Sequence, residues 1–125
     1  MRHYVLVDTS VWIDHLHKEI PELKTLLEKL RVFVHPFVEG ELALGRIKDR
    51  EEFLKAYRAL PCAMIARSSE IEFFIEKQEL AATGLGLVDT HLLASCMLDN
   101  NMLLWTHDKQ LAQFANRQGL AYKIP

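Results

Sequence analysis

The chain has 125 residues, half of them hydrophobic and about a quarter charged, which is the balance of one globular domain and excludes a disordered chain, a collagen and a long coiled coil. Fifteen Lys and Arg against 17 Asp and Glu leave a net charge of −2, which excludes a broad basic coat for nucleic acid but not local contacts to a few phosphates. No apolar run approaches the roughly 18 residues of a membrane span, and the N-terminus reaches Asp8 too early for a secretory signal.

Short apolar runs alternate with helical patterns along the chain. Predicted helices open with a proline or show apolar residues at helical spacing, and they stop at glycine or asparagine. In chain order, the pattern predicts a strand over Tyr4–Val7, helices over Ser10–His17 and from Pro21, a strand over Val32–Val34, helices over Pro36–Gly45 and Arg50–Leu60, a strand over Cys62–Ile65, a helix from Ser68, a break over Thr83–Gly86, a helix over Val88–Asn100, a strand over Met102–Trp105, a helix over Asp108–Arg117 and a strand over Ala121–Ile124. Five strands separated by helices predict one α/β domain over residues 1–125, with a parallel sheet between two layers of helices.

Two acids follow predicted strands. Asp8 comes directly after the first strand, and Asp108 comes three residues after Trp105. Because ligands of parallel sheets bind beyond the carboxyl ends of the strands, both acids are candidate site residues. Each also precedes a predicted helix, so an N-cap is the alternative for both, and it is the stronger alternative for Asp108.

Two further acids lie on apolar helix faces. At about 100° per residue, Glu41 lies at the centre of the stripe formed by Phe37, Val38, Leu44 and Gly45, where a charge must be paired or bound to a metal. A solvated helix former is the alternative for this mid-helix Glu, and the apolar stripe disfavours it. Asp89 lies on the apolar face of the Val88–Asn100 helix. It also stands at the N-terminus of that helix, where the dipole favours a carboxylate, so a cap and a ligand remain open.

Acids from separate segments that face one region indicate a carboxylate cluster. Several like charges at close range repel one another, so the cluster requires a cation. Oxygen ligands of this kind select Mg²⁺ or Mn²⁺ rather than zinc. Such a site is typical of metal-assisted phosphoryl transfer.

The histidines offer no metal site in the sequence. His15 and His17 are two residues apart and face opposite ways on a helix. The others show no metal-ligand spacing: His3, His35, His91 and His107.

The tryptophans and cysteines are predicted to be buried in the hydrophobic core. Trp12 and Trp105 each lie in an apolar run, where packing is favoured over base stacking. Cys62 and Cys96 are too few for a disulfide framework and lie among apolar residues, so both are predicted to be buried thiols of a cytosolic protein.

A basic cluster follows the third predicted helix. Arg46, Lys48 and Arg50 are either a phosphate clamp or a solvated group of cations at a helix C-terminus, and the sequence leaves both open.

Four short motifs carry a family resemblance. In order, they are Asp8–Asp14 (DTSVWID), Val38–Gly45 (VEGELALG), Val88–Ser95 (VDTHLLAS) and Trp105–Asp108 (WTHD). Each is unspecific alone, but in this order they resemble the PIN-domain ribonucleases and, within them, the VapC toxins of type II toxin–antitoxin modules. The resemblance covers nearly the whole chain.

The resemblance implies a Rossmann-like, three-layer fold with a five-stranded sheet of order 3-2-1-4-5. It places Asp8 beside the Thr106–Asp108 loop. It also implies a set of catalytic and metal-binding acids: Asp8, Glu41, Asp89 and Asp108. Ser10 (or Thr9) and Thr106 are the implied hydroxyls that orient carboxylates or water.

The implied activity is endonucleolytic cleavage of RNA with Mg²⁺ or Mn²⁺ in the cytoplasm. The implied partners are the RNA substrate, a second copy in a homodimer and a small inhibitory antitoxin, which together form a hetero-oligomer away from any membrane. Gln110 and Leu111 stand where many members carry an acid, so the role of Asp108 stays open.

Two other functions compete with the toxin. One is a non-catalytic interaction module on the same fold, which the retained acids disfavour. The other is an aspartate-based phosphatase or receiver-like domain. Asp8-Thr9-Ser10 lacks the acid that a haloacid-dehalogenase-like site carries two residues after its nucleophile.

Overall fold

The computed structural model describes residues 4–125, so His3 and the two residues before it lie outside the described part. The described residues form three strands and seven helices. In chain order these are β1 (Tyr4–Val7), α1 (Thr9–His17), α2 (Pro21–Glu28), β2 (Val32–Phe33), α3 (Pro36–Leu44), α4 (Arg50–Arg58), α5 (Ser68–Lys77), α6 (Leu87–Leu98), β3 (Met102–Trp105) and α7 (Lys109–Arg117). The predicted helices are confirmed, with ends that differ by one or two residues.

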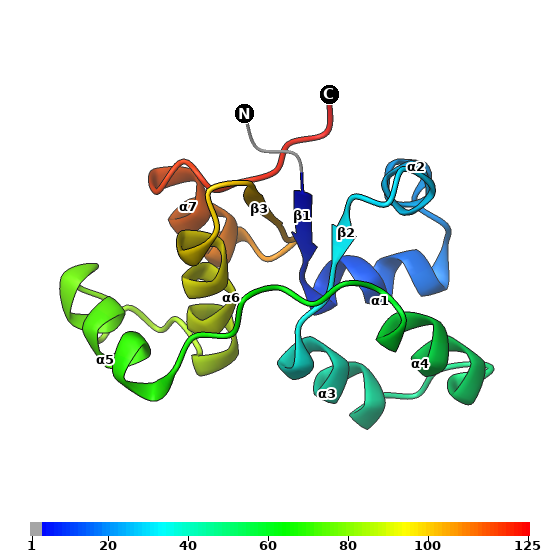
Figure 1. The fold of residues 1–125 in the computed structure, drawn as a ribbon, viewed down its shortest axis with the longest axis horizontal. Helices are drawn as coiled ribbons and strands as arrows, with labels where there is room; N and C mark the ends of the chain where they lie inside the picture. The colour runs from blue at the N-terminus through cyan, green and yellow to red at the C-terminus, as the bar shows by residue number, and fades with distance from the viewer. Residues whose placement is uncertain (1–3) are drawn as a thin grey trace.

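The three strands form a parallel sheet of order β2-β1-β3. Val5 pairs with Val32 on one side and with Leu103 on the other, and Val7 pairs with Trp105. In Figure 1 the strands lie at the centre, with α5, α6 and α7 on the side of β3 and α2, α3 and α4 on the side of β2. An α/β domain with a parallel sheet flanked by helices is therefore confirmed.

Two of the five predicted strands are wrong. The segment from Cys62 makes a single parallel bridge to Val34, because β2 runs at once into Pro36, which has no N–H to extend the ladder. Ala121 makes a single parallel bridge to Leu104. The next residue for that ladder is Thr106, which has already turned away from β3. The bridges nevertheless put both segments in the outer sheet positions that the 3-2-1-4-5 order requires.

The core lies on both faces of the sheet. Val5, Leu6 and Val7 are fully buried, as expected for a central parallel strand covered by helices on both sides. Trp12 and Trp105 are buried too, which confirms their prediction as core residues. Among residues 4–125 no helix is both long enough and apolar enough to cross a membrane.

The two thiols differ in burial. Cys96 is buried on α6, as predicted, but Cys62 is exposed, so its prediction is wrong. Cys62 lies at the outer edge of the sheet, where its one bridge leaves the side chain uncovered, and its Sγ donates to the Ala63 carbonyl at 3.3 Å.

Candidate active site

Asp8 stands at the carboxyl end of the central strand. Its backbone N–H donates to the Trp105 carbonyl at 2.9 Å, which continues the β1–β3 pairing by one residue. Asp8 occupies the N-cap position of α1, yet its side chain makes no cap hydrogen bond. Its Oδ2 atom instead accepts from the Ser10 hydroxyl at 2.7 Å and from the Thr106 hydroxyl at 2.8 Å. The carboxylate is 6% exposed and held from both sides.

The Thr106–Asp108 loop is fastened to α1 by the same hydroxyls. The His107 backbone N–H donates to Ser10 Oγ at 3.0 Å, and the Asp108 N–H donates to Thr106 Oγ1 at 3.0 Å. Ser10 and Thr106 lie 3.3 Å apart at their oxygens. The predicted neighbourhood of Asp8 and this loop is therefore present in the structure.

Asp108 caps α7. Its Oδ1 atom accepts from the Leu111 N–H at 2.9 Å, so the N-cap interpretation is correct for this residue. The second carboxylate oxygen is not used in the cap. Gln110, where the family resemblance led us to expect an acid, donates to the Thr83 carbonyl at 2.6 Å and ties α7 to the turn before α6.

Glu41 is exposed, so its predicted place at the centre of a buried stripe is wrong. The helix α3 buries Val38 and Leu42, whereas Leu44, which helped to define the expected stripe, is 90% exposed. Glu41 lies beside this buried face. Its carboxylate accepts a hydrogen bond of 2.5 Å from the Thr9 hydroxyl at the start of α1. This contact brings Glu41 to the carboxyl ends of the strands, where Asp8 lies.

Asp89 is half-buried in the first turn of α6, three residues after the N-cap Gly86. Burial above all, and then the negative charges of Asp8, Asp108 and Glu41, raise the pKa of the Asp89 carboxyl to about 6, against a hydrogen bond with the Gly86 backbone that lowers it. A cap contact and a carboxylate cluster therefore coexist at this residue. The four predicted acids, from four separate segments, lie close enough to act on one another electrostatically.

The four acids offer the type of ligand atom and the negative charge that a hard divalent cation such as Mg²⁺ prefers. All four side chains offer carboxylate oxygens, and within residues 4–125 none of them forms an ion pair with a Lys or Arg. As placed, however, no three His, Cys, Asp or Glu side chains in this range come near enough to hold one ion.

A histidine–aspartate pair borders the site and was missed in the sequence. His107 Nδ1 lies 2.5 Å from Asp14 Oδ2. Asp14 is four residues after Ser10, which puts both on one face of α1, but no local pattern shows that His107 lies against that face. The contact adds a second link between α1 and the Thr106–Asp108 loop.

A cavity of about 380 Å³ opens beside Glu41, between α1 and the end of α3. Its apolar lining includes Ile13, Leu16 and Ile47, and Arg46 and Lys48 stand at it as cations. Neither cation forms an ion pair among the described residues. Arg50, the third residue of the predicted basic cluster, instead donates to the Ala43 carbonyl at 2.9 Å and closes the end of α3.

Comparison with known proteins agrees with this geometry. The PIN domain family model matches residues 5–117. The chain is 38% identical over 117 residues to Ribonuclease VapC32 of Mycobacterium tuberculosis, in both strain CDC 1551 / Oshkosh and strain ATCC 25618 / H37Rv, and the match covers 94% of this chain and 94% of each relative. The chain therefore belongs to the PIN-domain family and is similar, along nearly all of its length, to a VapC-type ribonuclease.

Proposed function

We propose that this protein is a divalent-metal-dependent endoribonuclease, the toxin of a type II toxin–antitoxin module. The observation that carries the proposal is the electrostatic coupling of Asp89 to Asp8, Glu41 and Asp108 at the carboxyl edge of the sheet. Asp8 is buried and Asp89 half-buried, and negative charges held there without a counter-charge are unfavourable unless a cation neutralises them. The relatives named ribonucleases support RNA as the substrate.

The acids have distinct roles in this proposal. Asp8, Asp89 and Glu41 hold the cation, Mg²⁺ or Mn²⁺, and Asp108 contributes the oxygen that its cap leaves over. When bound, the cation activates water and stabilises the leaving oxygen of the phosphodiester. Ser10 and Thr106 are positioning residues, because their hydroxyls keep one Asp8 oxygen in place and leave the other for a ligand.

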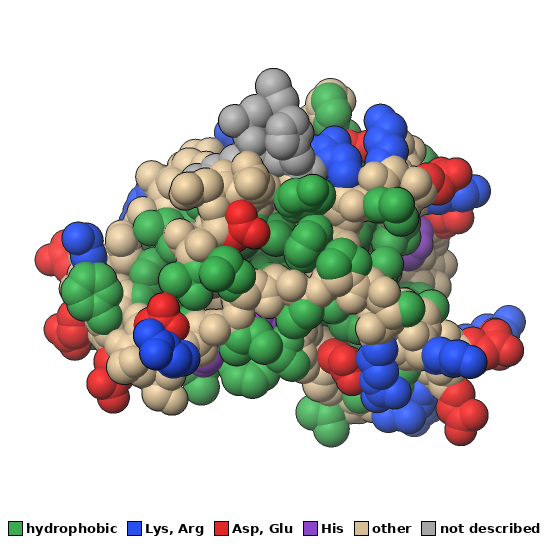
Figure 2. All heavy atoms as spheres, in the orientation of Figure 1, with side chains coloured by type: hydrophobic (Ala, Val, Ile, Leu, Met, Phe, Trp, Pro, Cys, Tyr) green, Lys and Arg blue, Asp and Glu red, His purple; other side chains and the backbone are tan. Residues whose placement is uncertain are grey.

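The RNA backbone is proposed to run from the acids along the cavity beside Glu41. A polyanion that crosses a carboxylate site needs cations beside it, and Arg46 and Lys48 line the same cavity as Glu41 and have no ion pair among residues 4–125. The face drawn in Figure 2 shows Lys and Arg side chains interleaved with Asp and Glu, and apolar side chains across its centre. RNA contact is thus local, as the net charge of −2 requires.

The partners follow the VapC-type assignment. We propose a small antitoxin that blocks the acids, a homodimer of this chain, and a toxin–antitoxin hetero-oligomer in the cytoplasm. An Arg or Lys of the antitoxin is the expected blocking group, since a guanidinium pairs with carboxylates through two hydrogen bonds.

The test is cleavage of total cellular RNA by the purified protein, with Mg²⁺ or Mn²⁺ and with EDTA. We expect Asp8→Asn and Asp89→Asn to reduce the rate at least about 100-fold. Asp99→Asn is the matched control, since Asp99 lies at the far end of α6 and its cap bond from the Asn101 N–H survives the change. Full activity in EDTA, or wild-type rates in both site variants, contradicts the proposal.

A further inference from the structure

An aromatic ring lies open to solvent beside Glu41 on α3. Phe37 is four residues before Glu41, which puts the two side chains within about 40° of each other around the helix and about 6 Å apart along its axis. The Phe37 side chain is 38% exposed. A ring one helical turn from a proposed metal ligand is within reach of a molecule that binds at the acids.

Two histidine rings hold Phe37 in place. The centre of the Phe37 ring lies 4.6 Å from that of His91 and 5.2 Å from that of His35, at interplanar angles of 72° and 63°. His35 is fully buried, and its Nδ1 atom accepts the backbone N–H of Phe37 at 3.0 Å. These edge-to-face contacts fix the ring before a ligand arrives, so a flat group can stack on it at little cost in side-chain entropy.

The same contacts place the ring between two of the acids. Phe37 is on α3, one turn before Glu41, and His91 is on α6, two residues after Asp89. A phosphodiester held at these acids carries a nucleoside on either side of it. The nucleobase of one of them is therefore a flat group that can reach Phe37.

Along α3 the side chains follow the order of the groups in a nucleotide chain. The Phe37 ring comes first, the Glu41 carboxylate follows, and the cations Arg46 and Lys48 come after the end of the helix, at the cavity beside Glu41. A base, the scissile phosphate and the next phosphate of one RNA strand match this order. A protein that docked on Phe37 through apolar contacts would need a contiguous apolar patch, and the Glu41 carboxylate interrupts it.

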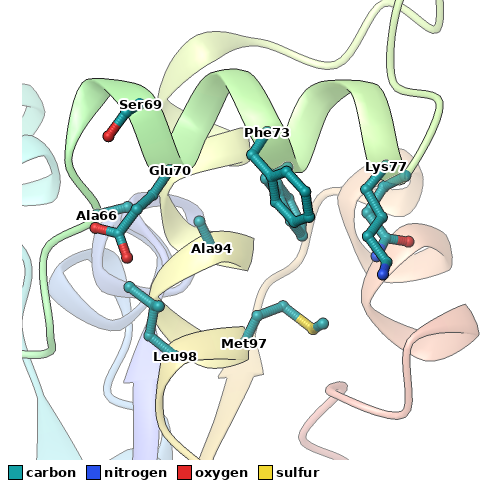
Figure 3. A pocket seen from close by; sticks show the side chains of 10 residues that line it. Ala66, Ser69, Glu70, Phe73, Lys77, Ala94, Met97 and Leu98 are labelled. Carbon is teal, nitrogen blue, oxygen red and sulfur yellow. The ribbon is translucent and has the colours of Figure 1, made fainter.

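Exposed rings elsewhere in the protein lack this setting. Tyr4, 37% exposed, lies at the amino end of β1 with its ring 4.9 Å from that of Phe33, at the opposite end of the strands from the acids. Phe73, 66% exposed, stands over Met97 at a cavity of about 440 Å³ between α5 and α6 (Figure 3), and none of the four acids lines that cavity. The position beside the acids, rather than exposure, distinguishes Phe37.

We propose that Phe37 is a substrate-binding residue whose ring stacks on the nucleobase beside the scissile phosphate. The proposal rests on the ribonuclease activity proposed above and adds to it a contact with a base. Because every base has a flat face, such stacking tolerates different sequences. Phe37 therefore determines how tightly, and in which position, the nucleotide is held.

The first test compares Phe37→Leu with the wild type in steady-state cleavage of a short RNA whose cleavage position has been mapped. We expect KM to rise about 5- to 100-fold, the loss typical of one stacked base, and kcat to stay within about threefold, because the contact is the same before and during the reaction. Phe37→Tyr keeps the ring and should keep the wild-type KM. Tyr4→Leu removes an equally exposed ring and Leu44→Ala an exposed apolar side chain of α3, and both controls should stay within about twofold.

The second test identifies the base. An abasic nucleotide replaces the nucleotide on each side of the mapped position in turn, and one of these RNAs should raise the wild-type KM by the same factor as Phe37→Leu. Combined with Phe37→Leu, that RNA should bring no further increase, since the stacking contact is already lost. Effects that multiply independently would show that Phe37 does not act on that base.

The third test detects stacking without cleavage. Single-stranded RNAs that carry one iodouridine at successive positions are irradiated with the protein in EDTA, because iodouridine crosslinks to an aromatic ring on which it is stacked. Mass spectrometry should find an adduct at Phe37, kept at the same position in Phe37→Tyr and lost in Phe37→Leu. An adduct at Phe37 without cleavage in Mg²⁺ would support the stacking contact and contradict the proposed activity, whereas cleavage without the adduct would contradict the stacking contact alone.

Thermal melting checks that Phe37→Leu is folded, and if it is not, the abasic RNAs and the crosslink test the wild-type protein by themselves. The proposal is overturned by a KM for Phe37→Leu within about twofold of the wild type, by a wild-type KM that neither abasic RNA changes, or by adducts only at residues other than Phe37. It is also overturned if Phe37→Leu keeps its KM for RNA and loses the antitoxin, because the ring would then be a contact for protein.

Discussion

Thr106 donates a hydrogen bond of 2.8 Å to Asp8 across 98 residues of sequence, and Ser10 donates to the same oxygen at 2.7 Å. The contact exists because β1 and β3 are neighbours in the sheet and end at the same edge. The pairing of β1 with β3 therefore also determines the geometry of the site, because it brings Thr106 to the Asp8 carboxylate that it orients.

Thr106→Val should lower the rate of RNA cleavage about 10- to 100-fold, as loss of a residue that orients a metal ligand does. Valine keeps the shape and removes the hydroxyl, so the Asp8 carboxylate loses a donor and the Asp108 N–H loses an acceptor. Thr25→Val, at an exposed site on α2, is the control. Single-turnover cleavage at saturating Mg²⁺ measures the effect, and a wild-type rate for Thr106→Val would show that the hydroxyl does not position Asp8.

Asp89→Asn should stabilise the metal-free protein at pH 7.5 by on the order of 1 kcal/mol, after allowance for solvent screening of a half-exposed group. The folded pKa of Asp89, about 6, lies above the unfolded value of about 3.9. Protonated Asp89 therefore favours the folded state at low pH, and this contribution is lost as the pH rises from about 4 through about 6. The advantage of Asn should fade below about pH 4.

Thermal melting in EDTA between pH 4 and pH 7.5 checks the Asp89 prediction, with Asp99→Asn as the control. Added Mg²⁺ or Mn²⁺ should stabilise the wild type more than Asp89→Asn, because the cation binds only the folded site. A lower melting temperature for Asp89→Asn in EDTA, with equal metal shifts in both proteins, would make Asp89 an ordinary helix cap.

Arg46→Ala and Lys48→Ala should each weaken binding of a single-stranded RNA and reduce the slope of log K against log salt by about 0.7, the share of one phosphate contact. Lys29→Ala tests for a general charge effect, because Lys29 lies between α2 and the start of β2, at the amino ends of the strands and away from the acids. Fluorescence anisotropy in EDTA, with a labelled 12-nucleotide RNA, reports binding without cleavage. Unchanged slopes in both variants would leave these residues as solvated cations at a helix end.

A small protein encoded beside this chain should co-purify with it and inhibit cleavage. An Arg or Lys of that protein should be required, because the four acids have no cationic partner within residues 4–125. Replacement of that cation by Ala should restore most of the RNA cleavage in a mixture of the two proteins. Failure to associate at micromolar concentrations would remove the support for a toxin–antitoxin pair.

The sequence predicts the helices and the central strands, because these follow from local periodicity, and the strand ends correctly place Asp8 beside the segment that follows Trp105. It fails where a neighbour decides the outcome. Cys62 and Ala121 form single bridges because β2 is cut short by Pro36 and β3 ends before Thr106. Glu41 is exposed because α3 packs against the rest of the protein through Val38 and Leu42.

The site contains contacts that no local pattern shows. The links from Thr9 to Glu41 and from His107 to Asp14 join segments far apart in the chain. They depend on which strands are neighbours, and the family resemblance supplied that order where periodicity could not.

The central claim is that Asp8, Glu41, Asp89 and Asp108 form one divalent-metal site. Isothermal titration of the RNA-free protein with Mn²⁺ tests it most directly, in the wild type and in Asp8→Asn, Asp89→Asn and Asp99→Asn. We predict saturable binding by the wild type and Asp99→Asn, and affinity at least about tenfold weaker in the two site variants. Equal Mn²⁺ binding by all four proteins, or none by the wild type, would contradict the account.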